Sequence, residues 1–188
     1  PSPDAMKCVA SRLRQYKPAH IVLDPVMVST SGHRLMDPEA EITLKEELFP
    51  LAELITPNIP EAEVLTGLLI TDDASMERAC YELYARFHCD ILLKSGHRND
   101  HANDLLYTGQ KALWIHGERI DNPNSHGTGC TLSSTIAANL AKGYTLEDAV
   151  KKAKEYLTEA LQIKLDLGKG HGPVDHTLGG QHTAYFYN

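Results

Sequence analysis

Short apolar runs alternate with stretches of helical periodicity along this chain. Five runs are predicted to be strands: HIVLD (20–24), ELIT (53–56), DILLK (90–94), DLLYT (104–108) and KALWI (111–115). The last two are close enough in sequence to form a hairpin that turns at Gly109-Gln110. Helical patterns separate the first three runs, which indicates crossover connections and parallel pairing. We therefore predict an α/β fold with a mainly parallel sheet, covered by helices on both faces in three layers.

Helical periodicity predicts the remaining elements. The predicted helices cover residues 4–16, 38–49, 60–66, 75–88, 128–142 and 146–164. A parallel sheet is normally built outward from an N-terminal strand, whereas this chain begins with a helix and offers few strands for its length. We therefore expect the N-terminal strands of the sheet to be missing. Residues 1–176 are predicted to form one domain, and residues 177–188 a polar tail.

The composition narrows the classes of function. The chain has 188 residues, a formal net charge of −7 and 42% hydrophobic residues, which is typical of one soluble globular domain. Lys and Arg are spread along it without a basic block, so no nucleic-acid partner is expected. No apolar stretch approaches the roughly 18 residues that a membrane span needs. We expect a cytoplasmic protein without a membrane partner.

The cysteines give no sign of a disulfide framework or a zinc site. They are Cys8, Cys80, Cys89 and Cys130, and none of them has C-x-x-C spacing. We expect four free thiols.

Two polar residues end predicted strands, and ligands of open α/β sheets gather beyond the carboxyl ends of the strands. Asp24 ends the first run before Pro25, and Lys94 ends the third run. Asp24 could simply turn the chain. Lys94 could offer a point charge to a phosphate, or it could be an ordinary solvated lysine.

Asn58 and Glu61 follow the second predicted strand in N-x-x-E spacing, at the start of a short helix. Asparagine before a helix and an acid in its first turn are ordinary capping residues. Together with Asp24, however, Glu61 would suit Mg²⁺, which keeps several waters and is held largely by substrate phosphates. We expect Glu61 to be an exposed side chain that matters for the metal rather than for stability, so its exchange for glutamine should change stability by roughly 0.5 kcal/mol or less.

The segment DNPNSHGTGCTLSSTIAANLAKG, residues 121–143, carries the strongest signal in the chain. Gly127 and Gly129 surround Thr128 and open a helix of small residues, which exposes backbone N–H groups at the positive end of the helix dipole. Such a terminus favours an anion. Cys130 lies in the first turn, where the dipole favours the thiolate, although a small buried cysteine is the alternative. Neither a Walker A motif nor a G-x-G-x-x-G dinucleotide fingerprint is present.

These motifs resemble one family. The runs VLDPVMVSTSG, ITPNIPEAEVLTG, LLKSGH and SHGTGCTLSSTIAANLAKG, with GHGPVDH near the end, are similar in order and spacing to the ribokinase-like kinases. Within that group they resemble the hydroxymethylpyrimidine/phosphomethylpyrimidine kinases of thiamine biosynthesis. The resemblance covers about residues 1–176 and matches the later two thirds of such a kinase.

The resemblance implies an ATP-dependent kinase that phosphorylates 4-amino-5-hydroxymethyl-2-methylpyrimidine and its monophosphate. It implies that Gly127, Thr128, Gly129 and Cys130 line an anion hole and that Cys130 is also the base toward the substrate hydroxyl. Cys130 should therefore be the most reactive thiol, since the other three lie within or beside apolar helix and strand patterns.

The same resemblance assigns the cofactors. Asp24 and Glu61, with Asn58, would organise Mg²⁺ and its waters. Lys94 would lie on the ATP side, and Asn58 and Gly129 would also contact the cofactor.

Two other functions stay open. A pyridoxal kinase acts on a similar heteroaromatic ring with a hydroxymethyl group, and the family segment that carries most of the pyrimidine pocket has no counterpart in PSPDAMKCV. A non-catalytic nucleotide-binding fragment is the second alternative. We also expect a homodimer.

Overall fold

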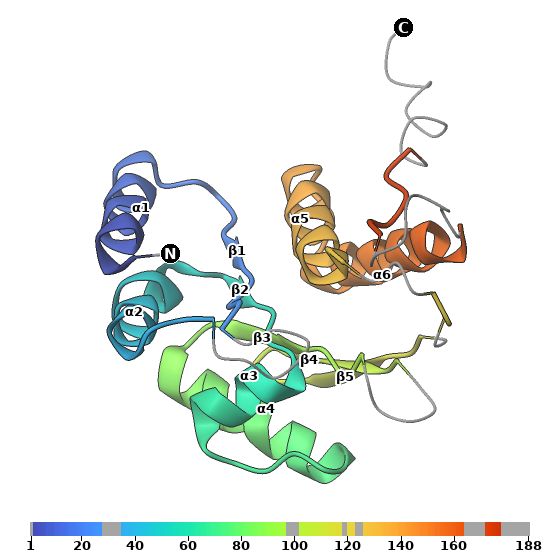
Figure 1. Cartoon of the computed structure of the whole chain (residues 1–188), viewed down its shortest axis with the longest axis horizontal. Helices are drawn as coiled ribbons and strands as arrows, with labels where there is room; N and C mark the ends of the chain where they lie inside the picture. The colour runs from blue at the N-terminus through green and yellow to red at the C-terminus, as the bar shows by residue number, and fades with distance from the viewer. Residues whose placement is uncertain are drawn as a thin grey trace, which may run out of the picture. The chain divides into compact units, whose positions relative to one another are not determined.

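The protein is described from a computed structural model, drawn in Figure 1. It describes residues 2–27, 35–96, 102–117, 120–122, 126–163 and 172–177. The chain divides into two compact units, Pro1–His116 and Gly117–Asn188, and each is described by itself. The predicted tail at 177–188 lies outside the described residues except for Thr177.

The first unit is built on a five-stranded sheet with strand order β1-β2-β3-β4-β5. The strands are β1 (Val22–Leu23), β2 (Leu54–Ile55), β3 (Asp90–Leu93), β4 (Asp104–Tyr107) and β5 (Ala112–Ile115). β1, β2 and β3 pair in parallel, while β3, β4 and β5 pair antiparallel. The predicted three parallel strands and hairpin are thus confirmed.

Four α-helices and two short turns accompany this sheet. They are α1 (Pro3–Tyr16), α2 (Pro38–Thr43), η1 (Leu44–Leu48), η2 (Phe49–Leu51), α3 (Ile59–Thr66) and α4 (Asp73–Phe87). The prediction of one regular helix over 38–49 is wrong. The helix widens to a π-helical turn in η1 and then tightens to a 3-10 turn in η2, where Pro50 has no N–H for a bond to the carbonyl four residues back.

Both faces of the central strands β2, β3 and β4 are buried, which is typical of strands in an α/β fold. On one face, Ile55, Ile91, Leu93 and Leu105 join the main hydrophobic core. Residues of all four helices complete that core, among them Met6, Ala40, Leu65 and Met76. The alternate residues Leu54, Leu92 and Leu106 are buried on the opposite face. The consecutive apolar residues of these central strands are therefore explained by burial on both faces.

In the second unit, the described residues form two packed helices, α5 (Thr128–Ala141) and α6 (Leu146–Gln162). The buried side-chain amide of Asn139 donates from Nδ2 to the carbonyl of Ala149 at 3.3 Å and so links the two. Thr145 caps α6, because its hydroxyl accepts from the N–H of Asp148. Throughout the described ranges, no helix combines the length and apolar character needed to cross a membrane.

Candidate active site

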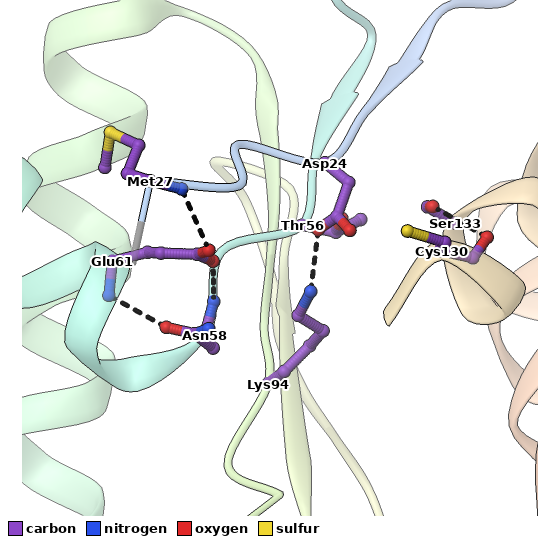
Figure 2. A network of polar contacts seen from close by, with 8 residues as sticks. All are labelled: Asp24, Met27, Thr56, Asn58, Glu61, Lys94, Cys130 and Ser133. Atoms are coloured by element: carbon purple, nitrogen blue, oxygen red, sulfur yellow. Dashed lines mark hydrogen bonds and ion pairs between the residues drawn. The ribbon is translucent and has the colours of Figure 1, made fainter. Parts of the chain in front are cut away.

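The candidate site lies where the three parallel strands end. Asp24 directly follows β1, Thr56 directly follows β2 and Lys94 directly follows β3. Because these strands are neighbours with the same direction, their carboxyl ends meet at one edge of the sheet. Figure 2 shows the three side chains pointing toward one another, although Asp24 and Lys94 are 70 positions apart in sequence.

An ion pair forms the centre of this cluster. Lys94 Nζ lies 2.7 Å from Asp24 Oδ1, and the two side chains are only 14% and 12% exposed. The buried hydroxyl of Thr56 donates to the same oxygen at 2.9 Å. Lys94 is therefore not a solvated surface lysine, and Asp24 is held by two other strand ends.

Asn58 and Glu61 form a complete capping box at the start of α3. Asn58 Oδ1 accepts from the N–H of Glu61, and Glu61 Oε2 accepts from the N–H of Asn58, both at 2.8 Å. The capping interpretation is thus confirmed, and the helix ends as predicted at Gly67, which has φ +76°. The backbone of Asn58 also bridges to Lys94, so the box lies next to the ion pair.

Glu61 is almost completely buried. Its residue is 2% exposed, and Oε1 makes a long 3.4 Å contact with the N–H of Met27, in the segment that follows Asp24. Burial raises the pKa of the Glu61 carboxyl above its ordinary value, while the N–H of Asn58 and the charge of Lys94 act in the opposite direction. The expectation of an exposed side chain is therefore wrong, because the segment that contains Met27 lies against this carboxylate.

A divalent cation can bind here only through carboxylate oxygens that do not already accept hydrogen bonds from the protein. Among the described residues, Asp24 Oδ2 accepts no hydrogen bond, whereas Asp24 Oδ1 accepts two. No group of three or more His, Cys, Asp or Glu side chains suited to a metal occurs in the described part of the chain. One free carboxylate oxygen, with Glu61 beside it, fits an ion such as Mg²⁺ that takes few protein ligands and keeps its waters.

In the second unit, Gly127 is the N-cap of α5 and has φ +84°, a left-handed conformation that glycine adopts without strain. The first bond of the helix runs from the N–H of Thr131 to the carbonyl of Gly127. The N–H groups of Gly129 and Cys130 precede that bond and have no helical acceptor, so the predicted anion-binding geometry is present in the backbone.

All four cysteines are free thiols, of which two are buried and two are exposed. Cys80 and Cys89 are buried, and burial, aided by a nearby carboxylate, raises the pKa of each thiol to about 12. Cys8 and Cys130 are exposed. The expectation that Cys8 lies in an apolar pattern is wrong, because at about 100° per residue it faces away from Met6 and Ala10, the buried residues of α1. Cys130 is therefore not the small buried cysteine of the alternative interpretation.

The sequence reasoning missed Thr56 as a site residue. It is the last residue of the predicted strand ELIT, and a polar residue that closes an apolar run beside two other strand ends was the available signal. Only the pairing of β1 with β2 shows which side chain its hydroxyl reaches.

Comparison with known proteins places these features in one family. The chain matches the family described as phosphomethylpyrimidine kinase over residues 1–175. It is 44% identical over 181 residues to the thiamine biosynthesis bifunctional protein ThiED of Geobacter sulfurreducens, covering 96% of this chain and 37% of the relative. It is 39% identical to the hydroxymethylpyrimidine/phosphomethylpyrimidine kinase of Haemophilus influenzae, covering 92% of this chain and 66% of that protein. The chain thus spans less than two thirds of the length of these relatives.

A solved structure with the same fold is the pyridoxal kinase of Bacillus subtilis, determined as an ADP complex. Its sequence is 32% identical to this chain, and the TM-score is 0.85 over 96% of this chain and 68% of that one. The predicted α/β, ribokinase-like fold class is confirmed.

Proposed function

Since this chain belongs to the phosphomethylpyrimidine kinase family, we propose that the protein phosphorylates the hydroxymethyl group of a pyrimidine with ATP. The substrates are 4-amino-5-hydroxymethyl-2-methylpyrimidine and then its monophosphate. One observation carries the proposal: residues from three separate family motifs, Asp24, Asn58 and Lys94, gather at the carboxyl ends of adjacent parallel strands. Phosphoryl transfer depends mainly on positioning and charge neutralisation, which such an edge supplies.

Mg²⁺ and ATP are the proposed cofactors. The ADP complex of the B. subtilis pyridoxal kinase supports an adenine nucleotide for a chain of this fold. Asp24 would hold Mg²⁺ through its free oxygen, and Glu61 would add negative charge behind it; Asn58, Lys94 and Gly129 would face the nucleotide. When bound, the ion would neutralise charge on the transferring phosphoryl group.

The side chains and backbone of this chain would supply positive charge, hydrogen-bond donors and a base for the phosphoryl transfer. The Lys94 ammonium is held at a fixed position by Asp24 and presents positive charge to the phosphates. We propose that the N–H groups of Gly129 and Cys130, with Gly127 and Thr128 shaping the turn, hold the phosphoryl oxygens as their charge develops. The Cys130 thiolate would accept the proton of the attacking substrate hydroxyl, whose oxygen bonds to the γ-phosphorus of ATP while the bond from that phosphorus to the bridging oxygen breaks and ADP leaves.

The role of Cys130 has a matched control within the chain. Cys130→Ser should fold normally, bind nucleotide and lose about 10² to 10⁴ in kcat, as expected for a general base. Cys8→Ser changes the other exposed thiol and should keep the full kcat. Iodoacetamide followed by peptide mapping should label Cys130 fastest; equal labelling of Cys8 together with near-normal kcat in Cys130→Ser would refute the assignment.

Pyridoxal kinase is the competing function, because the B. subtilis structure carries that name. Steady-state phosphorylation of the two substrates, followed by mass spectrometry, separates the alternatives. The proposal predicts a kcat/KM for hydroxymethylpyrimidine at least about tenfold above that for pyridoxal, a difference of ~1.4 kcal/mol in transition-state binding. The reverse preference would make it a pyridoxal kinase, and no product from either would favour a non-catalytic nucleotide-binding fragment.

Three expectations about the whole protein stay predictions: a single domain over residues 1–176, a cytoplasmic location and a homodimer. Analytical ultracentrifugation would measure the last of these, and a single monomeric species would contradict it.

A further inference from the structure

The hydroxyl of Thr56 has a role that the proposed mechanism leaves unused. We infer that Thr56 is a positioning residue, which turns the Asp24 carboxylate so that Oδ1 faces Lys94 and Oδ2 is left for a ligand. This inference rests on the proposed function, since the ligand in question is the Mg²⁺–nucleotide complex. Thr56 itself would not touch substrate or metal, because it is 0% exposed.

Two hydrogen bonds join Thr56 to the end of β1 and to Asp24, the residue that follows it. Its N–H donates to the carbonyl of Leu23 at 3.0 Å, and Leu23 is the residue directly before Asp24. Its Oγ1 donates to Asp24 Oδ1 at 2.9 Å. Thr56 therefore holds both the backbone beside Asp24 and the side chain of Asp24, and its β-branched side chain is stiff about χ1.

A lysine alone would not orient the carboxylate in this way. Lys94 reaches Asp24 on a long, flexible stem, and an ammonium can approach either carboxylate oxygen from many directions. A second donor on the same oxygen, mounted on a paired strand end, removes that freedom. Among the described residues Oδ2 has no hydrogen-bond donor, so the two-donor arrangement leaves one carboxylate oxygen for coordination.

Replacement by valine isolates this role. Thr56→Val keeps the β-branched shape and exchanges the hydroxyl for a methyl group, so the donor is lost while the side chain keeps its size. Thr56→Ser keeps the donor with a smaller side chain. Thr43→Val is a matched control, since Thr43 is also buried and its hydroxyl donates at 3.0 Å to the carbonyl of Glu39 in α2.

The test has two readouts on the wild-type chain and these three variants. The first is Mg²⁺-dependent binding of a non-hydrolysable ATP analogue, measured by titration calorimetry over a range of Mg²⁺ concentrations. Thr56→Val should weaken this binding by about 10-fold to 100-fold, as for loss of a hydrogen bond to a charged group. Thr56→Ser should stay within about threefold of wild type, and Thr43→Val should bind as wild type does.

The second readout is the crystal structure of ligand-free Thr56→Val, in which the Asp24 carboxylate should have turned away from its wild-type orientation. An unmoved carboxylate, or unchanged Mg²⁺-dependent affinity in Thr56→Val, overturns the inference. If the folded wild-type chain binds no nucleotide, the proposed function fails instead. In that case, a rotated Asp24 carboxylate in the Thr56→Val crystal structure would still support the positioning role of Thr56. An unmoved carboxylate would overturn that role too.

Discussion

Removal of the Lys94 charge should destabilise the protein strongly, because it leaves a buried carboxylate behind. Lys94→Met keeps most of the aliphatic stem and deletes the ammonium that lies 2.7 Å from Asp24 Oδ1. Asp24 then keeps the Thr56 hydroxyl as its only described donor. A single neutral donor offsets much less of the cost of burying a charge than an ammonium does.

The magnitude follows from burial. Loss of one partner from a fully buried pair costs about 3 to 5 kcal/mol. The side chains of Lys94 and Asp24 are 14% and 12% exposed, so limited solvent contact should lower this cost to about 2 to 4 kcal/mol. The folding equilibrium constant should fall by a factor of roughly 30 to 1,000.

Urea unfolding at neutral pH, followed by circular dichroism, measures this change. Lys151→Met is the matched control, because Lys151 Nζ also lies 2.7 Å from a carboxylate, Glu147 Oε1, but with side chains 46% and 37% exposed. That variant should unfold at the wild-type urea concentration, since exposed pairs contribute little. The two ion pairs thus have equal length and differ strongly in burial.

A double variant checks the cause. Asp24→Asn combined with Lys94→Met removes both charges and should recover at least about half of the stability that Lys94→Met loses. If Lys94→Met unfolds at the same urea concentration as Lys151→Met, the argument from burial is refuted. If the double variant is as unstable as Lys94→Met, the loss comes from packing and not from the uncompensated carboxylate.

Two further predictions concern the turn of the hairpin and the buried glutamate. Gly109 and Gly67 both have left-handed φ, but a Cβ at Gly109 would lie 2.1 Å from Cζ of Tyr84, whereas one at Gly67 would meet nothing within 4 Å. Gly67→Ala should therefore lower the free energy of unfolding, measured in urea, by about 1 to 2 kcal/mol, and Gly109→Ala should lower it clearly more. Equal losses in the two variants would show that the contact with Tyr84 has no cost. For Glu61, a raised folded-state pKa means that protonation favours the folded state, so this contribution is present below the ordinary pKa and is lost as pH rises through the raised value. The stability of wild type relative to Glu61→Gln should accordingly increase as pH is lowered from 7 toward 4.5, and a decrease would contradict it.

Most elements could be predicted because local signals agree with the fold. Asn58 and Gly67 bracket α3, and both are visible in the sequence as a cap and a stop. Pro50 was equally visible, but the widened turn before it lies against α1, where Arg14 pairs with Glu47 of η1 at 2.9 Å. Local pattern alone does not contain that contact.

The candidate site could be predicted only in part. The predicted strand ends indicated that Asp24 and Lys94 lie at the same edge of the sheet. Their contact joins positions 70 apart in sequence, however, and it can be predicted only once the order of the strands is known. Glu61 was recognised as a capping residue, but its burial follows from the Met27 segment that lies against it. Thr56 was missed for the same reason, since its partner comes from another strand.

The central claim is that phosphoryl transfer takes place at the carboxyl ends of β1–β3, with Asp24 holding the Mg²⁺. The most direct test is a Mg²⁺ titration of the phosphorylation rate of hydroxymethylpyrimidine in wild type, Asp24→Asn and Asp37→Asn. Asp37 precedes α2 without a side-chain cap and serves as the control. Asp24→Asn should need at least about tenfold more Mg²⁺ for half its maximal rate, as for loss of a charged ligand, while Asp37→Asn titrates as wild type. An unchanged Mg²⁺ requirement in Asp24→Asn would contradict the account.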